Sequence, residues 1–117
     1  MISFRRGAVG WSKAEVSNVA HYAIFDVEIH DLEKYKEYMA QVKPLIEAAG
    51  GRYLVRGGPH QVIEGKWKPT RLVIVEFPSA EAIKSFHESP VYQGLKELRQ
   101  AASSGDMVVV EGVDAST

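Results

Sequence analysis

The sequence contains no cysteine, which excludes disulfides, thiolate nucleophiles and cysteine-ligated zinc. It also has little net charge, because 14 lysines and arginines stand against 15 aspartates and glutamates, for a total of -1 at pH 7. Binding to phosphate backbones needs a basic field, so we expect no nucleic-acid partner. No stretch approaches the ~20 consecutive apolar residues of a membrane span, so we expect no membrane partner. The lack of cysteine fits a reducing compartment and favours a cytoplasmic protein.

Motifs for several common chemistries are also missing. The chain has no phosphate-binding loop, no dinucleotide fingerprint and no serine nucleophile elbow. The four histidines, His21, His30, His60 and His87, are far apart and form none of the short-spaced pairs typical of metal ligands. We therefore expect no metal and no cofactor, and the sequence predicts a fold more firmly than a reaction.

Length and composition predict one globular domain. The chain has 117 residues, of which 45% are apolar and 25% charged, without repeats or a low-complexity linker. Residues 1–19 lack the apolar periodicity of a core element, and we predict that they form a flexible N-terminal extension. Removing this extension should leave the melting temperature nearly unchanged unless Trp11 docks on the domain. Residues 20–117 are expected to form the single domain.

The first half of that domain predicts a strand, a helix and a second strand. His21–Ile29 is rich in β-branched and aromatic residues and predicts a strand. Asp31 can cap a helix whose apolar residues recur at steps of three and four, and Gly50 ends it as a left-handed cap. Arg52–Arg56 and His60–Glu64 then predict two halves of one strand, interrupted by two glycines and a proline.

The second half predicts two further strands and a second helical layer. Ser79 and Ser89 stand where side-chain oxygens can cap helices, and Pro90 follows as a favoured first helical residue. We expect a turn over Gly65–Thr70 and then a strand over Arg71–Phe77. A helix over Ala80–Glu88 and a helical segment from Pro90 should follow. Ser103–Asp106 should break that helix before a last strand over Met107–Val113. The order strand, helix, strand, strand, helix, strand predicts a ferredoxin-like α+β fold with an antiparallel sheet.

The alternation of side chains along the strands predicts a partner. In the first strand Ala23, Phe25, Val27 and Ile29 form one apolar face, which we expect under the helices. The other face, which carries Tyr22 and Ile24, also continues into apolar residues of the third and last strands. Two helices cover only one face of a sheet, and soluble monomers avoid large exposed apolar patches. We therefore predict a homodimer that covers the second face.

These residues as a group resemble a known family. The matching features are Tyr22–Asp26 leading into Asp31 and the helix with Tyr35 and Tyr38; Gly50–Gly58; Glu64 and Gly65; Glu76, Phe77 and Pro78; and Ser89, Pro90, Tyr92 and Arg99. Over roughly Ala20–Val113 the chain is similar to the domain-of-unknown-function family 1330 (DUF1330) of the dimeric α+β barrel superfamily. The resemblance implies a ferredoxin-like protomer whose sheet pairs with its twin into a barrel, and it supplies no established activity. Distant relatives include cofactor-free monooxygenases, small isomerases, haem-binding enzymes and stress-related binding proteins, so fold alone does not choose among them.

Three carboxylates interrupt apolar strand sequence and are candidate catalytic acids or bases: Asp26, Glu64 and Glu76. Paired strands could bring them to one face, where burial raises a carboxyl pKa and prepares it for proton transfer. His60, close to Glu64 in sequence, is a candidate general base. The alternative is structural, with the acids pairing with arginines such as Arg52, Arg56, Arg71 or Arg99 and holding the sheet or the dimer in register.

The leading functional hypothesis is recognition of a small organic molecule, with cofactor-independent acid/base chemistry as an extension of it. Arg52 or Arg71 would anchor a substrate carboxylate, because a guanidinium binds a carboxylate in a bidentate manner. Tyr92 could donate a hydrogen bond to the ligand, or else pack as a helix aromatic. The competing hypothesis is a non-catalytic binding or structural homodimer.

Overall fold

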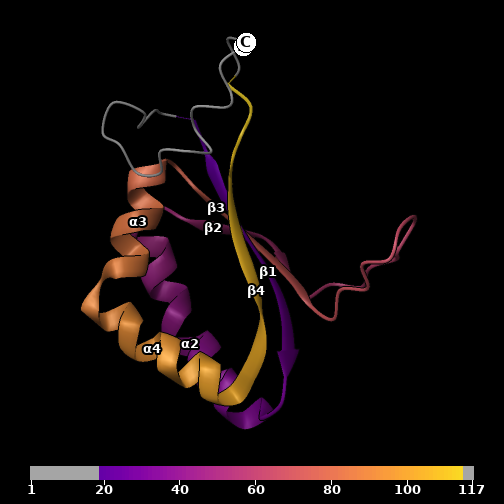
Figure 1. The fold of residues 1–117 in the computed structure, drawn as a ribbon. Helices are drawn as coiled ribbons and strands as arrows, with labels where there is room; N and C mark the ends of the chain where they lie inside the picture. The colour runs from indigo at the N-terminus through magenta and orange to yellow at the C-terminus, as the bar shows by residue number, and fades with distance from the viewer. Residues whose placement is uncertain (1–18, 115–117) are drawn as a thin grey trace.

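The computed structural model describes residues 19–114. The predicted extension over residues 1–19 therefore lies outside the described residues except for its last residue, and so does Trp11. The elements are β1 (His21–Ile29), α2 (Leu32–Ala48), β2 (Arg52–Arg56), β3 (Leu72–Phe77), α3 (Ala80–Glu88), α4 (Pro90–Ala102) and β4 (Ser103–Glu111). The three helices lie together on one side of the sheet (Figure 1). Among residues 19–114, no helix covers the other side of the sheet.

The four strands form one antiparallel sheet in the order β2-β3-β1-β4. β1 lies in the centre, with Ala23 opposite Val75 on one side and Val109 on the other. The chain order, with α3 and α4 forming the second helical layer, is that of a ferredoxin-like α+β fold. The predicted fold class is confirmed.

Local side-chain chemistry sets the helix ends. The carboxylate of Asp31 accepts from the backbone N–H of Lys34 at 3.1 Å, and Ser79 Oγ accepts from Ala82 at 3.1 Å. Ser89 caps α4 in the same way and separates it from α3. Gly50 ends the α2 region with φ of +85°, a left-handed conformation that glycine adopts without a steric penalty. These predicted caps are confirmed.

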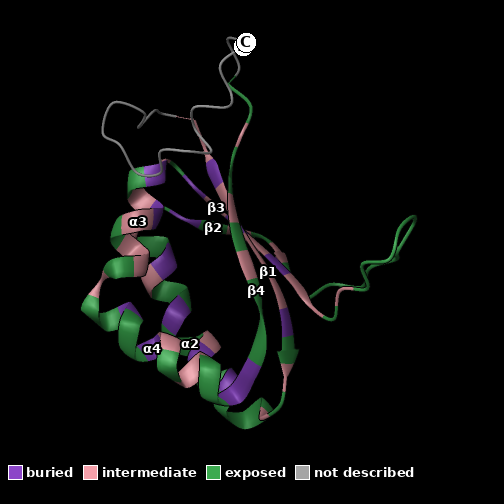
Figure 2. Ribbon diagram, in the orientation of Figure 1, coloured by how far each residue is buried: buried purple, intermediate pink, exposed green. Residues whose placement is uncertain are grey.

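The hydrophobic core lies between the sheet and the helices (Figure 2). Ala23 and Val27 of β1 and Val73, Val75 and Phe77 of β3 face inward and are buried, as their alternation predicts. The helices contribute the remaining core side chains, namely Tyr35, Tyr38, Val42, Ile46, Ile83, Tyr92, Leu95 and Ala102. On the opposite face, Val108 and Val110 of β4 stay 57% and 48% exposed. The sheet therefore has a covered inner face and an uncovered, partly apolar outer face.

Two sequence-based predictions are wrong. His60–Glu64 is not a strand, because β2 ends at Arg56 and the chain leaves the sheet at Gly57, whose φ is +78°. We call residues 57–71 the arm; it projects from the side of the sheet opposite the helices (Figure 1), and residues 58–68 are exposed throughout. The bounds of the last strand are also wrong, because Ser103–Asp106 end the helix as expected but already belong to β4. The carbonyl oxygen of Ala102 accepts from the backbone N–H groups of His30 and Asp31, and these bonds hold the start of β4 against the end of β1.

Residues 19–114 contain neither a membrane-length apolar helix nor a metal-binding cluster. None of the helices in this range is both long and apolar enough to cross a bilayer. No three histidine, aspartate or glutamate side chains within it are grouped closely enough to hold a metal ion.

Candidate functional site

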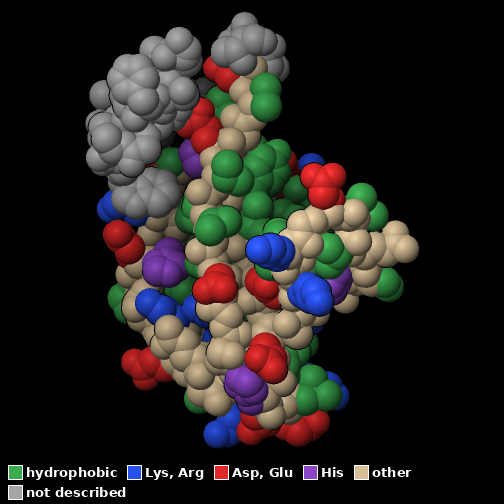
Figure 3. All heavy atoms as spheres, turned by 45° about the vertical axis from the view of Figure 1, so that its right-hand side comes forward, with side chains coloured by type: hydrophobic (Ala, Val, Ile, Leu, Met, Phe, Trp, Pro, Cys, Tyr) green, Lys and Arg blue, Asp and Glu red, His purple; other side chains and the backbone are tan. Residues whose placement is uncertain are grey.

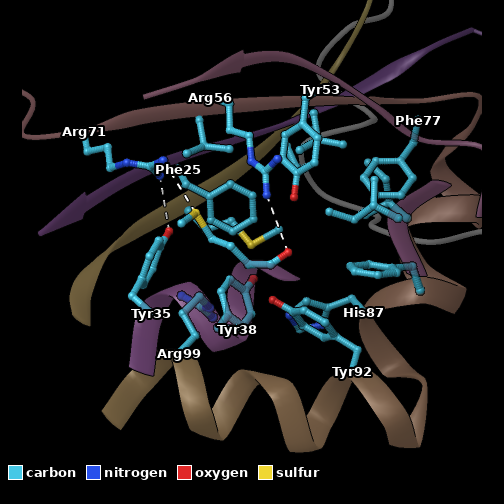
Figure 4. A pocket seen from close by; sticks show the side chains of 18 residues that line it. Phe25, Tyr35, Tyr38, Tyr53, Arg56, Arg71, Phe77, His87, Tyr92 and Arg99 are labelled. Carbon is cyan, nitrogen blue, oxygen red and sulfur yellow. Dashed lines mark hydrogen bonds between the residues drawn. The ribbon is translucent and has the colours of Figure 1, made fainter. Parts of the chain in front are cut away.

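A pocket opens between the inner face of the sheet and the helices (Figure 4). It takes residues from every element of the sheet and from all three helices. Its lining is Ala23, Phe25, Tyr35, Tyr38, Met39, Ile46, Tyr53, Arg56, Arg71, Val73, Val75, Phe77, Ile83, Phe86, His87, Tyr92, Arg99 and Met107. The lining is aromatic and aliphatic with a few convergent polar groups, which is the usual make-up of a small-molecule site.

The pocket is narrow. The space between its atoms is about 580 Å³ when the open mouth is included. The part of that space in which the centre of a water molecule fits is only about 30 Å³. A water needs roughly 10–15 Å³ measured in this way, so the free interior holds only a few waters. A larger ligand must be thin, or must displace a flexible side chain such as Met39, whose unbranched chain adapts easily.

Three arginines line the pocket, and aromatic rings hold them in place. The guanidinium carbon of Arg56 lies 4.4 Å from the ring centre of Tyr53, and that of Arg71 lies 5.5 Å from the ring centre of Tyr35. Arg99 lies 5.9 Å from the ring of Phe25. Such cation–π contacts orient a guanidinium without neutralising its charge. The positive charge therefore remains available to a ligand.

A β-bulge explains how β2 sends two side chains into the pocket. Tyr53 pairs with Val75 and Arg56 pairs with Val73, and both partners face inward on β3. The register shifts between Tyr53 and Val55, so the strand carries one extra residue there. In a regular strand, residues three apart point to opposite faces. The bulge at Leu54 is therefore what aims both Tyr53 and Arg56 at the pocket.

The charges of the arginines converge on the hydroxyl of Tyr35. Arg71 Nη1 donates to Tyr35 Oη at 3.4 Å (Figure 4). Burial raises the pKa of Tyr35, and the positive charges of Arg71, Arg99 and Arg56 oppose that rise. Within the described residues none of these three arginines forms a salt bridge, and no aspartate or glutamate lines the pocket. This end of the pocket is a cationic centre without a counter-charge.

Two polar atoms in the pocket, Tyr92 Oη and Arg99 Nε, are buried and have no protein partner at close hydrogen-bond geometry among the described residues. Tyr92 is only 1% exposed, and its ring packs 4.6 Å from Phe86 and 5.4 Å from His87. Burial raises the pKa of Tyr38 most, and the neighbouring Tyr92 hydroxyl raises it further by its charge and by a weak hydrogen bond between the two phenols. An unpartnered buried hydroxyl costs about 1–3 kcal/mol, so native structures rarely keep one without a reason.

His87 adds a titratable group at the aromatic end of the pocket. Partial burial lowers its pKa most, and the charges of Lys96 and Arg99 lower it further, while Glu88 opposes them. The imidazole is therefore held toward its neutral form. Arg99 is the one positive charge that acts on both His87 and Tyr35 among the causes of their pKa shifts.

The predicted ligand-binding residues are divided between the two faces. Arg71 and Tyr92 line the pocket, with Tyr92 deep inside it. Arg52 lies on the outer face, where its Nε donates to Glu76 Oε1 at 2.6 Å and Tyr22 Oη donates to the same carboxylate at 3.2 Å. The hydrogen bond from Arg52 is the main cause that lowers the pKa of Glu76. Glu76 is thus held in an ion pair away from the pocket.

The other predicted acids and His60 lie at the arm. Asp26 accepts from the backbone N–H of Thr70 at 2.8 Å and from the Trp67 indole at 3.0 Å, and its pKa is lowered mainly by the Thr70 bond. His60 Nε2 lies 2.8 Å from the Pro69 carbonyl oxygen, and Glu64 is exposed. Asp26 and Glu76 both lie on the outer face of the sheet. They are far apart on it, because Asp26 pairs with Leu72, which is four residues from Glu76 along β3. The structure does not bring the three carboxylates together, and their catalytic role stays a prediction.

Several pocket residues were not singled out from the sequence. Arg99 carried a signal, because it follows Leu95 by four residues and precedes Ala102 by three, which places a charge on the buried stripe of α4. Tyr35 and Tyr38 carried a weaker one, since two phenols on an inward helical stripe need polar partners. Arg56 carried none, because its direction depends on the bulge.

The fold and the site together define a ferredoxin-like α+β domain with one cationic pocket under its sheet. Residues 20–113 match the model of the family described as "Domain of unknown function (DUF1330)", and the chain belongs to that family. The resemblance noted in the sequence is confirmed. A comparison with curated proteins gives no match.

Solved structures share the fold. A protein of unknown function from Rhodopseudomonas palustris, RPA0582, is similar with a TM-score of 0.71 and 20% identity, over 87% of this chain and 88% of that one. Its methylated form gives a TM-score of 0.71 and 19% identity, over 90% and 89%. SnoaB, a cofactor-independent oxygenase from Streptomyces nogalater, is more distant, with a TM-score of 0.49 and 10% identity over 82% and 93%. The RPA0582 structures support the fold and carry no information on a ligand.

Proposed function

We propose that the protein is a homodimeric binding protein for a small organic molecule, which each protomer holds in the pocket between its sheet and its helices. The observation that carries this proposal is the pocket itself, which aromatic and aliphatic side chains line together with a few convergent polar groups. Tyr92 Oη and Arg99 Nε are buried polar groups of this pocket to which a ligand can form hydrogen bonds.

The outer face of the sheet supports the homodimer. Tyr22 pairs with Val110 and Ile24 pairs with Val108 across the β1–β4 ladder, so apolar side chains stand next to one another. Figure 3 shows hydrophobic side chains gathered on this side of the molecule. A second copy offers the same patch and can cover it symmetrically, and such obligate contacts commonly bury about 2,000 Å² or more.

Light scattering tests the dimer. The purified protein should show about twice the 13.0 kDa chain mass at micromolar concentration, and Val108→Asp should shift it toward one chain mass. Leu32→Asp is the matched control, because Leu32 is 52% exposed at the start of α2, on the helical side. A wild-type protein that is monomeric under these conditions contradicts the dimer.

Chemical-shift mapping tests the pocket. We would screen a fragment library against the ¹⁵N-labelled full chain and assign the amides that move. A pocket ligand should shift the amides of Tyr35, Arg71 and Tyr92 and leave those of Tyr22 and Val108 in place. A library without a single binder, or shifts confined to the outer face, contradicts the proposal.

The second candidate is a structural homodimer without a ligand. The ion pair of Arg52 with Glu76, joined by Tyr22, favours it, because these groups lie on the outer face and can hold a dimer in register. The same screen separates the two candidates, since a structural dimer binds no fragment in the pocket. Acid/base chemistry by Asp26, Glu64, Glu76 and His60 would require a ligand at the outer face or the arm, and stays a separate prediction.

A further inference from the structure

The charges that line the pocket are all of one sign. Arg56 is the last residue of β2, Arg71 is the last residue of the arm and Arg99 lies on α4, and within the described part of the chain no carboxylate lines the pocket with them. Gathering like charges in a partly desolvated place costs free energy unless an opposite charge is supplied. Residues 19–114 do not supply one there, so a ligand is a natural source.

The donors of these arginines are mostly unused. Arg71 makes two side-chain hydrogen bonds, to Tyr35 Oη at 3.4 Å and to Met39 Sδ at 3.7 Å, and both are long. Arg56 makes one, to the Met39 carbonyl oxygen at 3.5 Å, and Arg99 Nε makes none. A guanidinium carries five N–H donors in a planar fork that matches a carboxylate. The cationic centre therefore has free donors in the geometry that a carboxylate uses.

The other end of the pocket is aromatic. Phe77 and Phe86 have ring centres 5.5 Å apart, Phe86 and Tyr92 are 4.6 Å apart, and all three rings are tilted against one another. Figure 4 shows Phe77, Tyr92 and His87 at one end of the pocket and Arg71, Tyr35 and Arg99 toward the other. Tilted rings favour edge-to-face contacts with a further ring. Because the interior is narrow, a flat ring enters it with the least displacement of the flexible Met39 side chain.

From these two poles we infer that the ligand is a small aromatic carboxylate, with its carboxylate at Arg71 and Arg56 and its ring among Phe77, Phe86 and Tyr92. This inference rests on the proposed function, and it adds the chemical class of the ligand. A hydroxyl on the ring can in addition accept from or donate to Tyr92 Oη, which is buried beside Tyr38.

Calorimetric titration of the full-length protein tests the class with a matched pair of probes, benzoate and benzamide. The two have the same flat shape and differ in charge, so benzoate should bind at least ten-fold more tightly. Charged hydrogen bonds contribute enough to make that preference about ten- to a hundred-fold. Equal binding of both probes overturns the carboxylate inference and leaves pocket binding intact.

Two variants locate the carboxylate. Arg71→Gln and Arg56→Gln should each reduce benzoate affinity ten-fold or more and leave benzamide affinity unchanged. Arg52→Gln is the control, because Arg52 is an arginine of the same sheet whose side chain is 71% exposed on the outer face. If all three variants lose benzoate equally, the placement is wrong. If neither probe binds while neutral fragments shift the pocket amides, the carboxylate class is wrong. If neither the probes nor any fragment binds, the proposed function is wrong as well.

Discussion

The guanidinium of Arg71 lies over the backbone of Gly57, so closely that a β-carbon at position 57 would fall 2.6 Å from Arg71 Nε. Gly57 also has a φ of +78°, which residues with a β-carbon adopt at a cost of roughly 1–2 kcal/mol. One glycine therefore both turns the chain out of β2 and leaves the space in which the arginine reaches the pocket.

We expect Gly57→Ala to lower the free energy of unfolding by about 1–2 kcal/mol and to weaken benzoate binding, because the methyl group displaces Arg71. Urea unfolding and calorimetry measure the two effects. The matched control is Gly58→Ala, because nothing lies within 4 Å of a β-carbon at position 58 and its φ is not in the left-handed region. If the two alanine variants behave alike, the Gly57–Arg71 contact has no influence on the pocket.

Tyr92→Phe should affect stability and binding in opposite directions. Removing a buried hydroxyl that makes no close hydrogen bond should leave the free energy of unfolding unchanged or raise it by about 1 kcal/mol. Binding of 4-hydroxybenzoate should weaken, because the ligand loses a hydrogen-bond partner. Tyr22→Phe is the comparison, since Tyr22 Oη donates to Glu76 on the outer face and its loss should leave binding intact. A Tyr92→Phe protein that is clearly less stable would mean that the hydroxyl already has a partner.

Protonation of His87 should destabilise the fold below neutral pH. Its pKa in the folded protein lies below the ordinary value of 6.5, so the unfolded chain takes up the proton first as pH falls. Stability attributable to the neutral ring is complete above about pH 6.5 and decreases as pH falls from there toward the folded pKa. Urea unfolding at pH 7.5 and at pH 5 should show a smaller difference for His87→Gln than for the wild type. Parallel pH profiles for the two proteins would refute this role.

Asp26 and Glu64 should respond differently to neutralisation. Asp26→Asn cannot accept fully from both the Thr70 amide and the Trp67 indole, so we expect lower stability and a change in Trp67 fluorescence. Trp11→Phe as a background isolates that signal, because the chain has two tryptophans. Glu64→Gln should change neither stability nor benzoate affinity, because its side chain is exposed on the arm. Loss of ligand binding or turnover in Glu64→Gln would instead support the catalytic role predicted from the sequence.

Much of the fold was predictable because its signals are local. Asp31, Ser79 and Ser89 cap the helices that begin next to them, and alternation along β1 and β3 separates the buried face from the outer one. The arm was not predictable in this way. Val62 and Ile63 have strand-forming side chains, but the Gly57–Gly58–Pro59 sequence carries them beyond the reach of any partner strand in the described chain.

The site was less predictable because it depends on long-range geometry. Arg71 and Tyr92 were predicted from their chemistry to bind a ligand, and both line the pocket, whereas Arg52 shares the chemistry of Arg71 and faces the other way. The acids attracted attention because they interrupt apolar strands. Asp26 holds the arm and Glu76 holds an ion pair, and neither contact is visible until residues more than twenty positions apart meet.

Because of the extra residue at Leu54, the charge of the pocket depends on the number of residues in β2 as well as on their types. Deleting Leu54 would restore regular pleating and turn the guanidinium of Arg56 away from the pocket. None of the side chains that line the pocket would be changed. Insertions and deletions in this strand are therefore a route by which proteins of this fold can change what they bind. Relatives that differ by a single residue in β2 should differ in ligand charge, even where every arginine is retained.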